Sequence, residues 1–70
     1  MNMQASLTVD VVIPAFNVER YIAACLESLK SEKNEIGRIH VVNNGSTDST
    51  IQVVEHWSAA NPEMPIAIHT

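Results

Sequence analysis

The sequence predicts an α/β protein with a parallel sheet, in the order strand, helix, strand, helix, strand. Apolar runs rich in β-branched residues alternate with segments whose apolar residues recur at helical spacing. Short segments of turn-forming residues separate them. Such connections between parallel strands cross over with a right hand, which predicts the spatial strand order 3-2-1 with the helices on one face.

The first strand is predicted over residues 7–13, because its nearly continuous apolar run suits a strand buried on both faces. Asp10 is the one charge in this run and needs a partner or a sheet edge. Pro14 is expected to end the strand, since proline cannot donate to a ladder of hydrogen bonds. We expect residues 1–6 to be a disordered lead and residues 7–70 to form one partial domain.

The first helix is predicted over residues 18–30, with Asn17 as its N-cap. Its apolar residues recur every three or four positions and form one stripe. Cys25 lies on this stripe and is interpreted as a buried, inert thiol, since no histidine is near it in sequence. A polar turn is expected over residues 31–35.

A second strand over residues 38–42 ends in a strong turn signal, Asn-Asn-Gly at residues 43–45. Ser46 is expected to cap the second helix, and the Asn-Pro pair at residues 61–62 to end it. A short third strand follows over residues 65–69. The apolar stripe of the second helix comprises Ile51, Val54 and either Trp57 or Ser58.

Composition and length limit what this chain can be. Hydrophobic residues make up 46% and charged residues 17% of its 70 residues, which favours a packed fold over disorder. A three-stranded parallel sheet with two open edges and one bare face is not a finished domain. We therefore expect an incomplete domain that needs more chain or oligomerisation for stability.

Charge and targeting signals exclude several classes of protein. The net charge is −4 and the four basic residues are scattered, so we expect no nucleic-acid partner. No apolar run is long enough for a membrane helix, and the start lacks the features of a signal peptide. With Cys25 as the only cysteine, a cytoplasmic location is expected. The histidines His40, His56 and His69 show no ligand-like spacing, so no metal site is expected.

Two loops follow the carboxyl ends of the first two strands, where open α/β sheets bind their ligands. Residues 14–17 offer backbone carbonyls and the flat ring of Phe16, and residues 43–48 offer amides, hydroxyls and Gly45. Taken alone, each loop is read more simply as a turn followed by a helix cap. No glycine-rich dinucleotide fingerprint and no P-loop is present.

Together, the two loops and their flanks resemble the start of the family 2 glycosyltransferases. The resemblance rests on residues 11–17 (Val-Val-Ile-Pro-Ala-Phe-Asn), 26–29 (Leu-Glu-Ser-Leu) and 43–50 (Asn-Asn-Gly-Ser-Thr-Asp-Ser-Thr), and it extends over most of the chain. The fold it implies is a β-α-β-α-β, three-stranded half of the Rossmann-like GT-A nucleotide-binding domain.

The activity that the resemblance implies is transfer of a sugar from a nucleotide diphosphosugar, such as a UDP- or dTDP-sugar, to an acceptor. Carried over position by position, Pro14, Ala15 and Phe16 would line the base. Asn44 would occupy the place of the residue that bonds the polar edge of the base, and Asn43 directly precedes it.

The pair Asn43-Asn44 departs from the family pattern, which usually has at least one aspartate there. A hydrogen bond to a charged acceptor contributes about 1.5–3 kcal/mol, against about 0.5–1.5 kcal/mol for a neutral one. Asn44 therefore weakens a preference for uridine or thymidine without removing it. Glu19 is given no ligand role, because it is one position later than the usual glutamate.

The family's metal-binding Asp-x-Asp and its catalytic base have no counterpart in these residues. We therefore assign no catalytic residue and no metal ligand here, and we expect Mg²⁺ or Mn²⁺ only in the full-length enzyme. The chain alone is expected to be inactive. The alternative function is a non-catalytic binding or interaction module derived from such an enzyme. Membrane or homo-oligomer association would involve regions outside this stretch.

Overall fold

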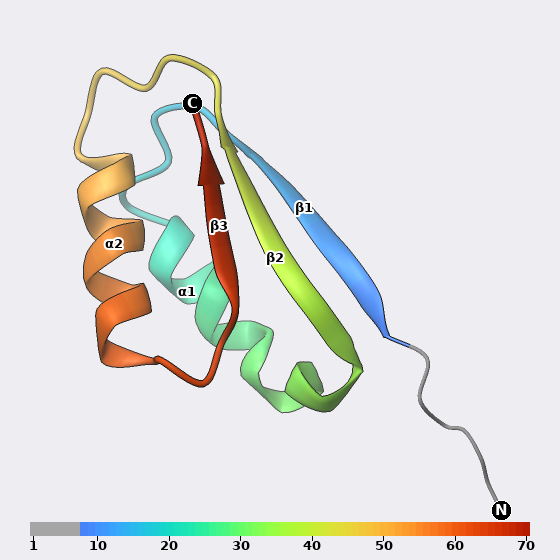
Figure 1. Cartoon of the computed structure of the whole chain (residues 1–70). Coiled ribbons are helices and arrows are strands. Elements are labelled where there is room, and N and C mark those ends of the chain that lie inside the picture. The colour runs from blue at the N-terminus through green and yellow to red at the C-terminus, as the bar shows by residue number, and fades with distance from the viewer. Residues whose placement is uncertain (1–7) are drawn as a thin grey trace, which may run out of the picture.

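A computed structural model describes residues 8–70 and shows one sheet of three parallel strands (Figure 1). Strand β2 lies between β1 and β3, which confirms the predicted order. The predicted lead over residues 1–6 lies outside the described residues. The elements are β1 (Val9–Ala15), α1 (Ile22–Ser28), the 3₁₀ helix η1 (Lys30–Glu35), β2 (Ile36–Asn43), α2 (Thr50–Ala60) and β3 (Ile66–His69).

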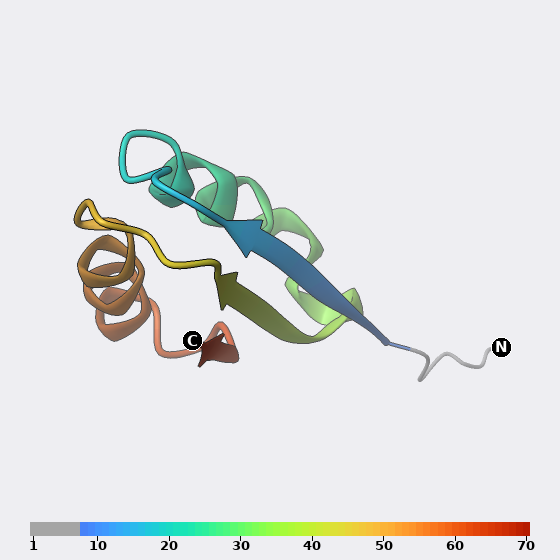
Figure 2. The same ribbon diagram turned by 90° about the horizontal axis from the view of Figure 1, so that it is seen from above.

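Both helices lie on the same face of the sheet, as predicted, and the core lies between the two layers (Figure 2). Fully buried aliphatic side chains in this layer come from different elements, among them Leu26 from α1, Ile39 from β2 and Val54 from α2. Alternate residues of a strand point to opposite faces, so every second residue of β1 and β2 faces the helices. The core also includes Ala15, Ile22, Ile36, Val41, Trp57 and Met64.

Strand β1 continues through Pro14 to Ala15, so the prediction that Pro14 ends the strand is wrong. Pro14 pairs in register with Val42 of β2. Among residues 8–70, β1 has a neighbouring strand on one side only. A proline is tolerated at such an edge, because its missing N–H would have faced away from the ladder.

Helix α1 begins at Ile22, four residues later than predicted, and Asn17 is not its N-cap. Asn17 has a φ of 52°, whereas an N-cap residue is usually extended. The segment before the helix is a turn, in which the N–H groups of Tyr21 and Ile22 donate to the carbonyl of Val18, each at 2.9 Å. At the other end, the expected polar turn is the 3₁₀ helix η1.

Cys25 is exposed, so its prediction as a buried thiol is wrong. Helix α1 contributes only Ile22 and Leu26 to the core as fully buried residues, because it has seven residues and touches the sheet along a narrow stripe. Tyr21 is also outside this stripe, and 65% of its surface is exposed.

Helix α2 begins at Thr50, so Ser46 does not cap it as predicted. The carboxylate of Asp48 accepts from the N–H of Thr50 instead (2.9 Å). The helix ends at Ala60 before the Asn-Pro pair, as predicted.

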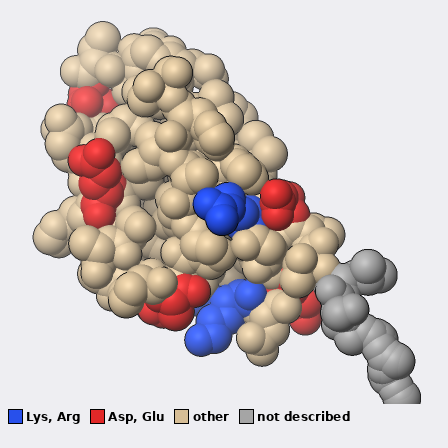
Figure 3. Space-filling model, viewed as in Figure 1, with Lys and Arg blue, Asp and Glu red and all other residues tan. Residues whose placement is uncertain are grey.

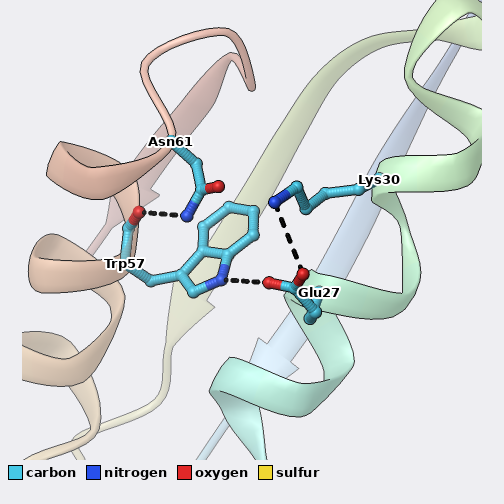
Figure 4. A network of polar contacts seen from close by, with 4 residues as sticks. All are labelled: Glu27, Lys30, Trp57 and Asn61. Carbon is cyan, nitrogen blue, oxygen red and sulfur yellow. Dashed lines mark hydrogen bonds and ion pairs between the residues drawn. The ribbon is translucent and has the colours of Figure 1, made fainter.

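Trp57 of α2 joins the two helices (Figure 4). Its ring is buried, as expected for a core residue, and its indole N–H donates to Glu27 Oε1 of α1 (3.1 Å). Lys30 Nζ lies 3.4 Å from the other oxygen of Glu27. The hydrogen bond from Trp57, followed by the contacts of Lys30, lowers the pKa of Glu27 below its usual value. Asn61 closes the network by donating its amide to the carbonyl of Trp57 (2.9 Å).

The other face of the sheet is covered by no element among residues 8–70 (Figure 2). Val12 points outward there, with 63% of its surface exposed. In the view onto this face, Lys and Arg side chains form small separate groups away from the strand-end loops (Figure 3). In this part of the chain, no helix has the length and apolar character needed to cross a membrane.

Candidate functional site

The two loops that follow β1 and β2 lie side by side at the carboxyl edge of the sheet (Figure 1). The backbone N–H of Asn44 donates to the carbonyl of Ala15 (2.8 Å), which continues the β1–β2 pairing into the second loop. Adjacent parallel strands bring their carboxyl ends to one edge, so segments nearly thirty residues apart in sequence become neighbours.

The side chain of Asn17 links the first loop to the second. Its Oδ1 accepts from the backbone N–H groups of Thr47 (2.8 Å) and Asp48 (3.3 Å). Its own backbone N–H donates to the hydroxyl oxygen of Ser46 (3.1 Å). The left-handed backbone of Asn17 is one that asparagine tolerates better than most residues.

A second group of hydrogen bonds joins the same loops closer to the helices. The N–H of Val18 donates to Thr50 Oγ1 (2.9 Å), and the N–H of Glu19 donates to Asp48 Oδ2 (3.3 Å). In return, the N–H of Ser49 donates to Glu19 Oε1 (2.7 Å). The Thr50 hydroxyl also donates to Asp48 Oδ1. We call the side chains that make these links, Asn17, Glu19, Ser46, Asp48 and Thr50, the interloop clasp.

The clasp perturbs the acidity of Asp48. Partial desolvation tends to raise the pKa of its carboxyl. Hydrogen bonds from the hydroxyl and N–H of Thr50 and from the N–H of Glu19 favour the ionised form, and together they bring the pKa below its usual value. Asp48 is therefore a charged acceptor that holds backbone donors of both loops.

Of the five residues predicted to bind a base, three are exposed, and the other two make hydrogen bonds that hold the second loop. Phe16 and Asn44 are exposed at the edge of the sheet, and 58% of the surface of Phe16 is accessible. Pro14 is also exposed. Ala15 is fully buried in the core, so its contribution to the site is the carbonyl that holds Asn44. Asn43 Oδ1 accepts from the N–H of Ser46 (2.9 Å) and shapes the turn.

Gly45 leaves open space next to Asn44. Its φ is +81°, which favours glycine, and a Cβ built there would meet no atom within 4 Å. The surface around Phe16 and Asn44 thus offers an aromatic face, an amide with both a donor and an acceptor, and an unobstructed backbone. These groups suit a flat heterocycle with polar atoms on its edge.

Two surface hollows do not coincide with the candidate site. The larger, of about 420 Å³, lies over α1 and α2 and includes His56 and Trp57 in its wall. The smaller, of about 170 Å³, is apolar and runs beside β1, bordered by Pro14, Tyr21 and Cys25. Neither hollow is lined by Phe16 or Asn44. The candidate site is therefore defined by the side chains at the strand ends and not by a hollow.

The residues near the site do not fit a divalent cation. The carboxylates of Glu19 and Asp48 are occupied by backbone N–H groups of the clasp. Within residues 8–70, no group of three or more His, Cys, Asp or Glu side chains is arranged to hold a metal ion.

Sequence reasoning identifies both loops but misses the clasp. It interprets Asn17 and Ser46 as helix caps, because each precedes a helical pattern. The available signal is the parallel order of the strands, which places both loops at one edge with polar side chains facing backbone donors. Rules that consider only neighbouring residues predict instead that such side chains cap the helix that follows them in sequence.

Comparison with known proteins agrees with the fold and the loop pattern. The sequence model described as glycosyl transferase family 2 matches residues 10–69, which is nearly the whole chain. The chain belongs to this family. The family match begins within β1 and ends within β3, so it includes both strand-end loops.

Several curated relatives are named as glycosyltransferases or as synthases. The chain is similar to glycosyltransferase GlyA of Streptococcus pneumoniae (36% identity over 71% of this chain and 7% of GlyA). It is similar to a chondroitin synthase of Pasteurella multocida (33% identity, 83% and 6%) and to the putative glycosyltransferase EpsH of Bacillus subtilis (34% identity, 71% and 14%). The chain thus spans a small fraction of the length of these relatives. No solved structure matches it significantly.

Proposed function

We propose that this chain forms the nucleotide-binding wall of a glycosyltransferase that moves a sugar from a nucleotide diphosphosugar to an acceptor. The observation that supports this most is the juxtaposition of Phe16 and Asn44. The two residues stand on adjacent strand ends joined by the 2.8 Å hydrogen bond from Asn44 to Ala15. Family membership supports sugar transfer as the reaction class.

In the proposed site, the base lies against Phe16 and Asn44 bonds its polar edge. The Asn44 side-chain carbonyl can accept from an imide N–H, and its amide can donate to a base carbonyl. Uracil and thymine offer both groups, so a uridine or thymidine diphosphosugar is the proposed donor. The sugar and diphosphate extend away from this wall, toward parts of the enzyme outside these residues.

In this proposal, the 70-residue chain alone does not catalyse sugar transfer. Sugar transfer needs a base for the acceptor proton, and the carboxylates next to the loops are held in the clasp. Mg²⁺ or Mn²⁺ and the catalytic base are assigned to the remainder of the enzyme. Release of UDP from a UDP-sugar by the purified 70-residue chain would contradict this assignment.

A titration with UDP tests the role of Phe16. Stacking of a base on an aromatic ring contributes about 1–3 kcal/mol, so Phe16→Ala should weaken UDP binding by about 5- to 150-fold. Tyr21→Ala is the matched control, since Tyr21 is an equally exposed aromatic residue outside the proposed contact. Equal effects of the two substitutions, or none from Phe16→Ala, would contradict the proposed site.

A further inference from the structure

The uncovered face of the sheet has a chain of polar contacts that is separate from the strand-end loops. Each strand supplies one member: Asp10 from β1, His40 from β2 and His69 from β3. His40 Nε2 lies 3.1 Å from Asp10 Oδ2, and His40 Nδ1 lies 2.9 Å from His69 Nε2. The two histidines are 29 positions apart in sequence, so only the parallel register of β2 and β3 brings them together.

The two imidazole rings meet edge to edge. Their centroids are 5.1 Å apart, which exceeds the distance between the facing nitrogens by about the sum of two ring radii. The two nitrogens therefore point almost directly at each other. If His40 Nε2–H donates to Asp10, then His40 Nδ1 is unprotonated and accepts the one proton shared with His69.

Gly37 makes room for the carboxylate in this arrangement. A Cβ built on Gly37 would lie 2.7 Å from Asp10 Oδ1, closer than real Cβ contacts. The glycine thus lets the Asp10 side chain lie across β2 and reach the far nitrogen of His40. This contact also provides the partner that the single charge of the first strand was expected to need.

Two facing imidazole nitrogens that share one proton can instead share a metal ion. Imidazole suits Zn²⁺, Ni²⁺ and Cu²⁺, and a carboxylate on the far nitrogen of a ligating histidine fixes its tautomer and raises its basicity. We propose that His40 and His69 form a two-histidine site for a divalent transition metal ion, with Asp10 as the positioning residue behind His40.

The geometry requires a rearrangement of both rings and solvent ligands. Zn–N bonds are about 2.0–2.1 Å, so two nitrogens on a tetrahedral ion lie about 3.4 Å apart. The pair must therefore separate from 2.9 Å, and each ring must turn so that its nitrogen points at the ion and not at the other ring. No third protein ligand is arranged for it among residues 8–70, so water fills the other positions. The site is accessible, because the His40 side chain is 25% exposed and His69 is exposed.

The test is a titration of the 70-residue chain with ZnCl₂, followed by the NMR signals of the three histidine rings. We expect the rings of His40 and His69 to shift together and the ring of His56 to stay unchanged. His40→Gln and His69→Gln should each abolish tight binding, and Asp10→Asn should weaken it by about 10- to 100-fold. His56→Gln is the matched control, since His56 lies exposed on α2.

A folding readout separates this site from binding to unfolded chains. An ion that binds only the folded state raises the unfolding temperature, by more the tighter it binds, so Zn²⁺ should stabilise the wild type and His56→Gln but not His69→Gln. Equal Zn²⁺ affinity of the wild type and the His40→Gln/His69→Gln double variant would overturn the proposal. So would equal losses from His56→Gln and His69→Gln. The proposed glycosyltransferase function does not depend on this result.

Discussion

At the scale of single residues, the position of Asn44 could be predicted from the sequence, whereas the role of Asn17 could not. The position of Asn44 at the exposed strand end follows from the strand pattern and the turn signal that succeeds it. The role of Asn17 does not, because its side chain bonds residues thirty positions away. Local capping rules describe contacts within a few residues, and only the packed sheet supplies the distant partners.

Asn44→Asp should strengthen binding of UDP. A carboxylate in place of the amide is a charged acceptor for an imide N–H, and the difference between charged and neutral hydrogen bonds is about 1 kcal/mol, or about fivefold in affinity. Isothermal titration calorimetry with UDP and with ADP measures the change in affinity. The gain should be absent for ADP, since adenine has no imide N–H, and an equal gain for both nucleotides would contradict the assignment of Asn44.

Thr50→Val should destabilise the fold by about 1–3 kcal/mol, because it leaves the N–H of Val18 without its acceptor in a part-buried position. Thr50 is fully buried, and valine preserves its shape. Urea unfolding followed by circular dichroism measures the loss. Thr47→Val is the control, since Thr47 is exposed and should change stability by less than about 0.5 kcal/mol. Similar effects of the two substitutions would argue against the clasp.

At the scale of elements, the sequence predicted the type and order of every strand and both α-helices, because apolar periodicity differs clearly between strands and helices. The boundaries near the loops were wrong. Helix α1 starts four residues late and α2 also starts after its predicted cap, because the intervening residues bond across the two loops instead of within a helix. Cys25 was wrongly predicted to be buried for a related reason, since a helix of seven residues buries a narrower stripe than the predicted longer helix would.

Leu26→Ala tests the packing of α1 on the sheet. Leu26 is fully buried in the core, and removing a buried leucine side chain costs about 2–5 kcal/mol. Such a loss should abolish cooperative thermal unfolding in so small a fold. Cys25→Ser, one position away on the exposed side, should change stability by less than about 0.5 kcal/mol. A large effect of Cys25→Ser would mean that α1 is rotated relative to the described structure.

At the scale of the whole molecule, the fold presents a covered face and a bare one, as the strand count and the short chain predicted. Exposed apolar residues at both ends of β1, such as Val9 and Phe16, agree with the expectation of low stability. The histidine pair on the bare face could not be predicted from spacing, because register between strands determines which side chains meet.

Stability should fall as the pH drops below about 4, and Asp48 should account for part of this fall. Its pKa is lowered in the folded state from the usual 3.8, so its contribution is present above that value and is lost as the pH falls through the lower folded pKa. Asp48→Asn should flatten the acid limb of a plot of unfolding temperature against pH. Glu63→Gln, on an exposed residue after α2, should leave it unchanged. An acid limb that keeps its full slope in the Asp48→Asn variant would contradict the role of this carboxylate.

The most direct test of the central claim is a ¹H–¹⁵N NMR titration of the 70-residue chain with UDP at millimolar concentrations. We predict weak binding whose shifts are confined to the amides of Phe16, Asn17, Asn43, Asn44 and Gly45, on both strand-end loops together. The absence of shifts at these amides, or shifts centred on the hollow over α1 and α2, would contradict the claim that the two loops form a base-binding wall.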